Sequence, residues 1–233
     1  RPWSMTLPPT QAPSALPTLK APMFRVATRF GAACPTRTTL TCSAGTAAKA
    51  AAVDRSQYFV EYFCAQGLFE RSHFLMGMEE AFCAYLEEPE AMFEMLTAIA
   101  DYKKRLIKEA AFHLKPDVIF FQDDWGSKQN LFLPPDVWRE MIKPLQTEIA
   151  QVIHECGMIY VHHADCICEP IVEDMAEIGI DIWQGVIPQN DILSIQERLG
   201  GRMALIGGID GPAIDDVDTT DAEIMAEVHR CVD

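Results

Sequence analysis

The chain has 233 residues, of which 49 % are hydrophobic and 23 % charged, so it can bury one sizeable core and one folded domain is expected. Its formal net charge of −15 argues against a nucleic-acid partner, because nucleic-acid-binding domains usually carry a basic face, and it disfavours an anionic membrane surface. No run approaches the roughly 20 apolar residues that a membrane span needs.

Residues 1–50 differ in composition from the rest of the chain. They contain no Asp or Glu, but they hold seven of the fifteen prolines and six Lys or Arg residues. Such a segment buries too little apolar surface to offset its chain entropy, so we expect it to be disordered. Two alternatives stay open. The segment is basic and acid-poor, as a transit peptide is, or it is non-native sequence at the upstream end of a gene fragment, which we favour.

From residue 57 onward, short runs of β-branched and aromatic residues alternate with segments of helical spacing. The expected strands share this apolar character and span residues 58–64, 117–121, 157–161, 180–183 and 203–206. The expected helices span residues 78–113, with a second helix beginning at Pro89, then 134–155, 169–177 and 191–199, followed by a last helix capped by Thr219 or Thr220.

Alternating strands and helices predict a parallel sheet with right-handed crossovers. Polar residues recur at the carboxyl ends of the strands, which form the active face of a (β/α)8 barrel and also the ligand edge of an open doubly wound sheet. The barrel is favoured because no glycine fingerprint follows an early strand. Since only about five strands are expected, against the eight of a complete barrel, residues 51–233 are predicted to form an incomplete, TIM-barrel-like α/β domain.

The first polar cluster is residues 123–127, Asp-Asp-Trp-Gly-Ser, directly after the second expected strand. Two adjacent carboxylates in such a place are costly unless they are solvated, paired or bound to a cation. One would bind a cation or a polar group of a substrate, and the other would act as a general acid or base. Alternatively, Asp123 caps a turn and Asp124 faces solvent. The position at the active face favours Asp123 and Asp124 as catalytic candidates, with Trp125 and Ser127 as substrate-binding candidates.

The second polar cluster, residues 162–168, contains two His, one Asp and two Cys. His-x-Asp and His-x-x-Cys pairs are short enough to meet one metal ion from a loop, and imidazole and thiolate favour Zn²⁺. His163, Asp165 and Cys166 are therefore candidate metal ligands, and a further ligand would come from elsewhere. Alternatively, one His is buried and hydrogen-bonded to the backbone, and the cysteines are small core residues.

The eight cysteines of the chain do not have the spacing of a disulfide framework. A chain of this length does not need such a framework to fold, because it can bury a core of its own. We therefore expect reduced thiols and a cytoplasmic location.

Weaker candidates for substrate binding lie elsewhere on the same expected face. Residues 207–210, Gly-Gly-Ile-Asp, follow the last expected strand, where glycines allow a close backbone approach to a ligand. Gly208 and Asp210 are the candidates there, although this segment equally well shapes a turn. His73 is expected on another loop of this face, and Gln184 comes at the end of the fourth expected strand.

The order of these motifs resembles the uroporphyrinogen decarboxylase superfamily, whose members are (β/α)8 barrels. The resemblance covers roughly residues 57–233 and rests on Asp-Asp-Trp-Gly-Ser at 123–127, Leu-Pro-Pro-Asp-Val-Trp-Arg-Glu-Met-Ile-Lys-Pro at 133–144, His-Ala-Asp at 163–165, Met-Ala-Glu-Ile-Gly-Ile-Asp at 175–181 and Leu-Ile-Gly-Gly-Ile-Asp at 205–210.

The resemblance implies an enzyme with one of two chemistries. One branch decarboxylates the acetate arms of uroporphyrinogen III, in tetrapyrrole (heme) biosynthesis, without metal or cofactor. The other branch consists of zinc methyltransferases that move methyl groups between corrinoid proteins and thiols, and of related demethylase components. Only the second branch carries a His at the position of His163. The resemblance therefore favours metal-assisted methyl transfer that involves a corrinoid or a small methylated substrate.

The chain departs from the methyltransferase pattern at Asp165, where the zinc methyltransferases have a Cys. This departure weakens both the zinc site and the expectation of a thiol substrate, and the last zinc ligand of that branch would lie after Asp233. On this interpretation a metal at His163, Asp165 and Cys166 activates the substrate. Asp124 would then position the methyl donor or acceptor, and Asp210 would line the pocket.

Two other functions stay open. In a uroporphyrinogen III decarboxylase, an aspartate would hold the pyrrole N–H groups, and Asp124 would contribute to this contact. Alternatively, the chain is an inactive truncated remnant, because an incomplete barrel exposes unpaired edge strands. The partners that the resemblance implies are a small-molecule or tetrapyrrole substrate and a corrinoid protein, and a homodimer is a further expectation.

Overall fold

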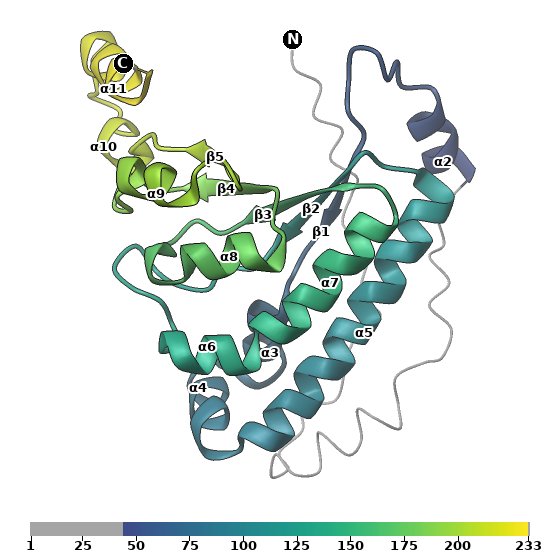
Figure 1. The fold of residues 1–233 in the computed structure, drawn as a ribbon. Helices are drawn as coiled ribbons and strands as arrows, with labels where there is room; N and C mark the ends of the chain where they lie inside the picture. Colours follow the sequence, from purple (N-terminus) through teal and green to yellow (C-terminus); the bar gives the residue numbers. More distant parts are fainter. Residues whose placement is uncertain (1–43, 233) are drawn as a thin grey trace.

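A computed structural model describes residues 44–232. Its centre is one five-stranded parallel sheet in the order β1-β2-β3-β4-β5, so that each strand pairs with its neighbours in the sequence (Figure 1). The strands are β1 (Glu61–Cys64), β2 (Val118–Gln122), β3 (Ile159–His163), β4 (Ile182–Val186) and β5 (Ala204–Gly207). The fold is α/β, and a parallel sheet with sequential strand order is that of an incomplete TIM-barrel-like domain, as the sequence predicts.

Helices fill every connection between the strands. Between β1 and β2 lie α3 (Leu68–Met76), α4 (Met78–Glu87) and α5 (Pro89–Leu114), and between β2 and β3 lie α6 (Pro135–Met141) and α7 (Lys143–Glu155). The 3₁₀ turn η1 (Glu169–Ile171) and α8 (Val172–Ile178) precede β4, and α9 (Ile192–Leu199) precedes β5. α2 (Ala44–Ala51) comes before β1, and α10 (Gly211–Ile214) and α11 (Asp221–Val232) follow β5. None of these described helices is long and apolar enough to cross a membrane.

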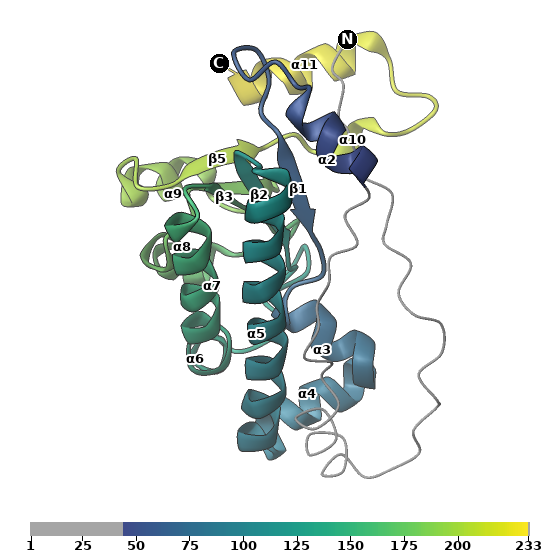
Figure 2. The ribbon, with the colours of Figure 1, turned by 90° about the vertical axis from the view of Figure 1, so that its right-hand side faces the viewer.

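The two faces of the sheet have different surroundings. α5, α7, α8 and α9 follow one another in a layer against one face (Figures 1 and 2). Side chains that point into this layer, such as Phe121, Tyr160 and Trp183, are fully buried. Successive side chains of a strand point to opposite faces, and on the other face Phe63 and Ile206 are exposed. Within residues 44–232 this second face has no helix layer against it, and we call it the open face.

All five predicted strands form, but four of them end one to three residues later than the sequence predicts. β3 is the important case, because the sequence predicts an end at Val161 and the strand continues through His163. Adjacent residues of a strand face opposite ways, so His162 points into the helix layer and is buried, whereas His163 is on the open face and is partly exposed. The two histidines therefore have different environments.

The helices differ from the prediction in two places. The expected helix 134–155 is broken into α6 and α7, because Pro144, in the first turn of α7, has no N–H to continue the preceding helix. Residues 68–76 form α3, so His73 lies on a helix and not on the expected loop. At the start of α11 the prediction of a cap is confirmed. The Thr220 hydroxyl accepts the backbone N–H of Glu223, whose carboxylate accepts the backbone N–H of Thr220.

Helix α2 includes the last seven residues of the segment 1–50 for which disorder is the expectation. Its residue Ala50 is buried, and α2 lies beside α5. The rest of that expectation concerns residues 1–43, which lie outside the described residues.

Candidate functional site

A row of polar side chains crosses the open face of the sheet where β2, β3 and β4 end. In the register of these strands, Gln122 pairs with His163, and His163 pairs with Gln184. All three side chains are partly exposed, while their sequence neighbours Phe121 and Trp183 point into the helix layer and are buried. The carboxyl ends of parallel strands are the ligand-binding edge of barrel folds. This row is therefore the centre of the candidate site.

The imidazole of His163 is held on both sides. Its Nδ1–H donates to Oε1 of Gln184 on β4, and its ring stacks on Phe120 with centroids 5.7 Å apart. A neutral His whose Nδ1 carries the proton has its lone pair on Nε2. That Nε2 lies 4.0 Å from Oδ1 of Asp124. The side chains of His163 and Asp124 are 24 % and 32 % exposed, so a ligand on the open face can reach both.

Asp124 links two loops at the carboxyl edge of the sheet. Its Oδ1 accepts the backbone N–H of Asp165 at 2.8 Å, which ties the loop after β2 to the loop after β3. The side chain of Asp165 points outward and is exposed. The structure therefore brings Asp124 and His163 together as predicted neighbours, with Asp165 contributing its backbone to their arrangement.

Asp123 is buried and acts as a cap, which is closer to the alternative that it caps a turn than to a catalytic carboxylate. It is fully buried, and it accepts the backbone N–H groups of Phe69 and Glu70 at 3.0 and 2.8 Å and the indole N–H of Trp125 at 3.0 Å. The first two groups belong to the first turn of α3, whose N–H groups have no partner within the helix. Burial raises the pKa of Asp123 to about 6, although these three donors lower it. Asp123 therefore caps α3 and connects the start of this helix to the loop after β2, which carries Asp124.

Trp125, a predicted substrate-binding residue, is buried in this structure. Its indole stacks on the ring of His162 with centroids 4.0 Å apart and packs edge-on against Trp138. His162 accepts the Tyr160 hydroxyl at Nδ1 and donates from Nε2 to the carbonyl of Asp123. Burial lowers the pKa of His162 to about 3, so this ring is neutral. These aromatic rings support the loop that carries Asp124.

The predicted metal ligands do not converge. Cys166 is fully buried in the core, where its Sγ lies 3.5 Å from Sγ of Cys168, and the amide of Asn190 bonds the backbone of both cysteines. Cys166 is therefore part of the core, whereas His163 is on the open face and partly exposed. Among residues 44–232, no group of three or more His, Cys, Asp or Glu side chains is arranged to hold a metal ion. Buried Cys166 does not suit the zinc site that the family resemblance implies, while His163 and Asp165 as ligands stay a prediction.

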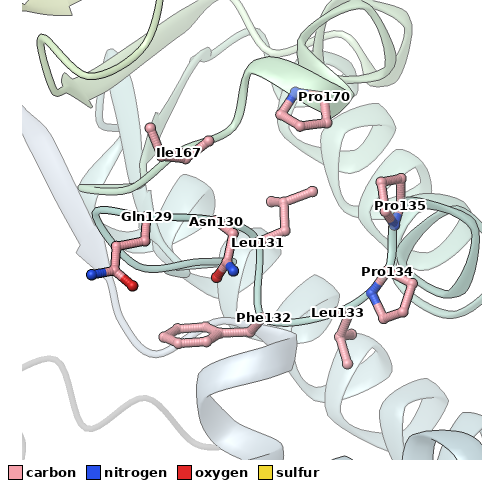
Figure 3. A pocket seen from close by; sticks show the side chains of 9 residues that line it. All are labelled: Gln129, Asn130, Leu131, Phe132, Leu133, Pro134, Pro135, Ile167 and Pro170. Carbon is pink, nitrogen blue, oxygen red and sulfur yellow. The ribbon is translucent and has the colours of Figure 1, made fainter.

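Ser127 lies in a loop next to a hollow. Its hydroxyl accepts the backbone N–H groups of Gln129 and Asn130, which shapes the turn after β2. The hollow measures about 420 Å³, and Figure 3 shows the side chains that surround it: Gln129, Asn130, Leu131, Phe132, Leu133, Pro134, Pro135, Ile167 and Pro170. The lining is mostly apolar and includes none of the predicted site residues. The Ser127 side chain therefore stabilises the turn after β2.

The remaining predicted residues are occupied by packing or backbone contacts. The carbonyl of Gly208 accepts the side chains of Arg230 and Cys231 from α11, and Asp210 precedes α10 and donates its backbone N–H to Glu227. The ring of His73 on α3 packs against Phe69 and Phe74, and burial lowers its pKa. Gln184 is the exception among the substrate-binding candidates, because it contacts His163 directly.

Glu70, on the first turn of α3, is a residue that sequence reasoning misses. It is only 8 % exposed, and its Oε1 accepts Gln122 at 3.4 Å, while Oε2 is buried and has no hydrogen-bond partner. Burial, followed by the charges of Asp123 and Asp124, raises the pKa of Glu70 to about 7. A carboxyl group whose pKa is shifted by burial and by neighbouring charges is a candidate for a functional site. The available signal was an acidic residue within the apolar run Leu68-Phe69-Glu70.

Comparisons with known proteins show the family and the fold of the chain. A model of the family described as uroporphyrinogen decarboxylase (URO-D) matches residues 69–233. The chain is similar to the solved structure of a methyltransferase from Methanosarcina mazei, with a TM-score of 0.55 and 19 % identity over 70 % of this chain. It spans 48 % of that structure, about half its length, and this likeness shows the fold alone. No curated protein matches. The family model covers most of the sequence, and the chain belongs to the uroporphyrinogen decarboxylase family.

Proposed function

We propose that the chain acts in the methyltransferase-like branch of its family, taking a methyl group from a small methylated substrate and passing it to a corrinoid. One observation carries the proposal: Gln184 fixes the Nδ1–H of His163, so the Nε2 lone pair is presented on the open face beside Asp124. The sequence resemblance places a His here only in the methyltransferase-like branch. The likeness to a solved methyltransferase supports the same fold family.

The proposed task of His163 and Asp124 is to orient the substrate. Nε2 of His163 and the carboxylate of Asp124 both accept hydrogen bonds, so they suit a substrate with a hydroxyl or N–H group near its methylated atom. Phe120 and Phe63, whose rings lie 5.5 Å apart on the open face, give the apolar part of such a substrate a surface to pack on. Fixing the methyl donor in one orientation lowers the entropic part of the activation barrier for methyl transfer. A reduced corrinoid, when bound, supplies the nucleophile that takes the methyl group.

Zinc has no place in these steps. The candidate ligands His163, Asp165 and Cys166 do not form a three-ligand site, since Cys166 points into the core. The roles of His163 and Asp124 are therefore derived from their own hydrogen-bonding groups.

The test is methyl transfer to free cob(I)alamin, which is monitored through the absorbance change as the corrinoid is methylated. The full chain is incubated with a panel of methyl ethers, methylamines and methyl sulfonium compounds. We expect transfer from at least one donor and a loss on the order of 10²-fold in His163→Ala, because orientation of the donor is lost. His113→Ala, on the exposed part of α5, is the matched control and should keep the wild-type rate. No transfer from any donor would refute the proposal.

A uroporphyrinogen decarboxylase is the second candidate, and the description of the matching family model favours it. Asp124 would then contact the pyrrole N–H groups of the substrate. Anaerobic incubation with uroporphyrinogen, followed by chromatography of the oxidised products, separates the two functions. Loss of carboxyl groups from the tetrapyrrole, without methyl transfer, would establish the decarboxylase.

A further inference from the structure

The carboxyl group of Glu70 lies behind the polar row of the open face. The backbone N–H of Glu70 donates to Asp123, so the residue that caps α3 also holds the backbone of Glu70 in place. Its Oε1 is within 3.4 Å of the amide of Gln122, and Gln122 is the strand neighbour of His163. One side chain therefore separates Glu70 from His163. A bond of 3.4 Å is at the weak limit of hydrogen bonds, so Gln122 is held loosely.

The second oxygen of Glu70 has an unusual environment. Oε2 is shielded from solvent and has no hydrogen-bond partner among the described residues. A buried carboxylate oxygen in this state is unfavourable, whereas a protonated carboxyl group lacks only an acceptor for its O–H. The charged groups that face it are the carboxylates of Asp123 and Asp124 from the loop after β2, and they also oppose ionisation. Burial and these charges together favour a neutral Glu70 that keeps its proton.

We infer that Glu70 is the proton donor of this site and gives its proton to the substrate atom from which the methyl group departs. The inference rests on the proposed methyl transfer. A substrate that displaces the amide of Gln122 meets the carboxyl group of Glu70 at Oε1, the oxygen that Gln122 contacts in this structure. His163 and Asp124 hold the same substrate from the other side.

The bond between the methyl carbon and the leaving oxygen or nitrogen breaks, and its electron pair stays on the leaving atom. The nucleophile supplies the electron pair of the new bond to the methyl carbon. The O–H bond of Glu70 breaks with its electrons left on the carboxylate, and the proton joins the leaving atom, which departs as a hydroxyl or amine. Solvent returns a proton to Glu70 afterwards.

Two methyl donors separate this role from a structural one. A methyl ether leaves as an alkoxide or phenoxide and needs a proton, whereas a methyl sulfonium leaves as a neutral thioether and needs none. With free cob(I)alamin as acceptor, Glu70→Gln should lower the rate on the ether on the order of 10²-fold or more, the usual contribution of a general acid. The same variant should change the rate on the sulfonium less than about threefold. The wild-type rate on the ether should fall as pH rises through 7, and the sulfonium rate should not.

The outcomes are distinct. Equal losses on both donors would assign Glu70 a structural role and overturn the inference, while the proposed methyl transfer would stand. An unchanged rate of Glu70→Gln on the ether would also overturn it. A wild-type protein that demethylates no donor of the whole panel, methylamines included, would overturn the proposed function, and the role of Glu70 with it. Thermal unfolding of Glu70→Gln verifies that the variant folds; if it does not, Glu70→Asp, which keeps the acid and moves it, should show the same selective loss on the ether.

Discussion

Gln184 on β4 holds the imidazole of His163 on β3 by accepting its Nδ1–H, and this contact fixes which nitrogen of His163 faces Asp124. The contact depends on the backbone between them. Gly185 has φ +91° at an irregularity of the β4–β5 pairing, and a Cβ there would lie 3.1 Å from Cε1 and Nδ1 of His163. The strand therefore makes room for the ring and supplies its partner within two consecutive residues.

The first prediction concerns this contact. Gln184→Leu removes the acceptor, so His163 loses its preference for the Nδ1–H tautomer, and we expect activity to fall about tenfold or more. Gln184→Glu keeps an acceptor at the same place and should retain the tautomer. The ¹⁵N chemical shifts of the His163 ring report the tautomer directly. If the ring keeps the Nδ1–H form in Gln184→Leu, the contact does not set the orientation.

The second prediction concerns the close packing of Gly67 on Asp123. A Cβ at Gly67 would lie 2.2 Å from Cβ and 2.3 Å from Cγ of Asp123, so Gly67→Ala forces the carboxylate away from the N-terminus of α3. We expect a loss of about 1–3 kcal/mol in the free energy of unfolding, as for an overpacked core. Gly211→Ala is the matched control, because it has nothing within 4 Å and no positive φ. Urea denaturation of both variants should show a loss in Gly67→Ala alone.

The sequence predicts the sheet well because its signals are local. The apolar runs of the five strands and the alternation with helices are visible in short windows, and they lead to the parallel strand order. The ends of the strands are less well predicted. The extension of β3 to His163 depends on pairing of His163 with Gln122 and Gln184, which lie on other strands.

The site is only half predictable for the same reason. His163 and Asp124 have visible positions, since each follows an apolar strand. The sequence leaves open whether Asp123 is catalytic or a cap, because its partners are backbone groups at Phe69 and Glu70, more than 50 residues away. No local pattern shows that one of two adjacent carboxylates turns toward a helix end. Glu70 was missed because its environment is created by that same long-range contact.

The third prediction concerns acid stability. Burial lowers the pKa of His162 to about 3 in the folded protein, whereas a His in an unfolded chain has a pKa of about 6.5. Unfolding therefore takes up a proton below pH 6.5, and stability is lost as pH falls from 6.5 toward 3. Between pH 6.5 and 5 the loss from this group amounts to about 2 kcal/mol.

His162→Gln keeps a polar side chain but cannot titrate. The variant should be less stable than the wild type at pH 7.5, because it loses the stacking on Trp125. Its free energy of unfolding should then change less between pH 6.5 and 5. Urea denaturation at several pH values gives both slopes, and equal slopes would show that His162 does not contribute to the acid dependence.

The fourth prediction concerns the ion pairs that join α8 to α6 and α7. Asp174 on α8 accepts Arg139 Nε at 3.0 Å and Lys143 Nζ at 2.6 Å, and its side chain is only 12 % exposed. Burial acts to raise the pKa of Asp174, but the bonds to Lys143 and Arg139 outweigh it and lower the pKa. Asp174→Asn replaces the carboxylate that Arg139 and Lys143 share by a weaker acceptor, although Asp136 and Glu177 remain as exposed partners. We expect a loss of about 1–3 kcal/mol in the free energy of unfolding.

Asp136 provides the matched control, because it also pairs with Arg139, at 3.1 Å, but its side chain is 98 % exposed. An ion pair in water contributes little, so Asp136→Asn should change the free energy of unfolding by less than about 0.5 kcal/mol. The lowered pKa of Asp174 also determines how its contribution to stability changes with pH. Its contribution is present at neutral pH and is lost as pH falls, so the difference between wild type and Asp174→Asn should shrink in acid. A difference that grows in acid would mean that Asp174 is not stabilised as a carboxylate between these helices.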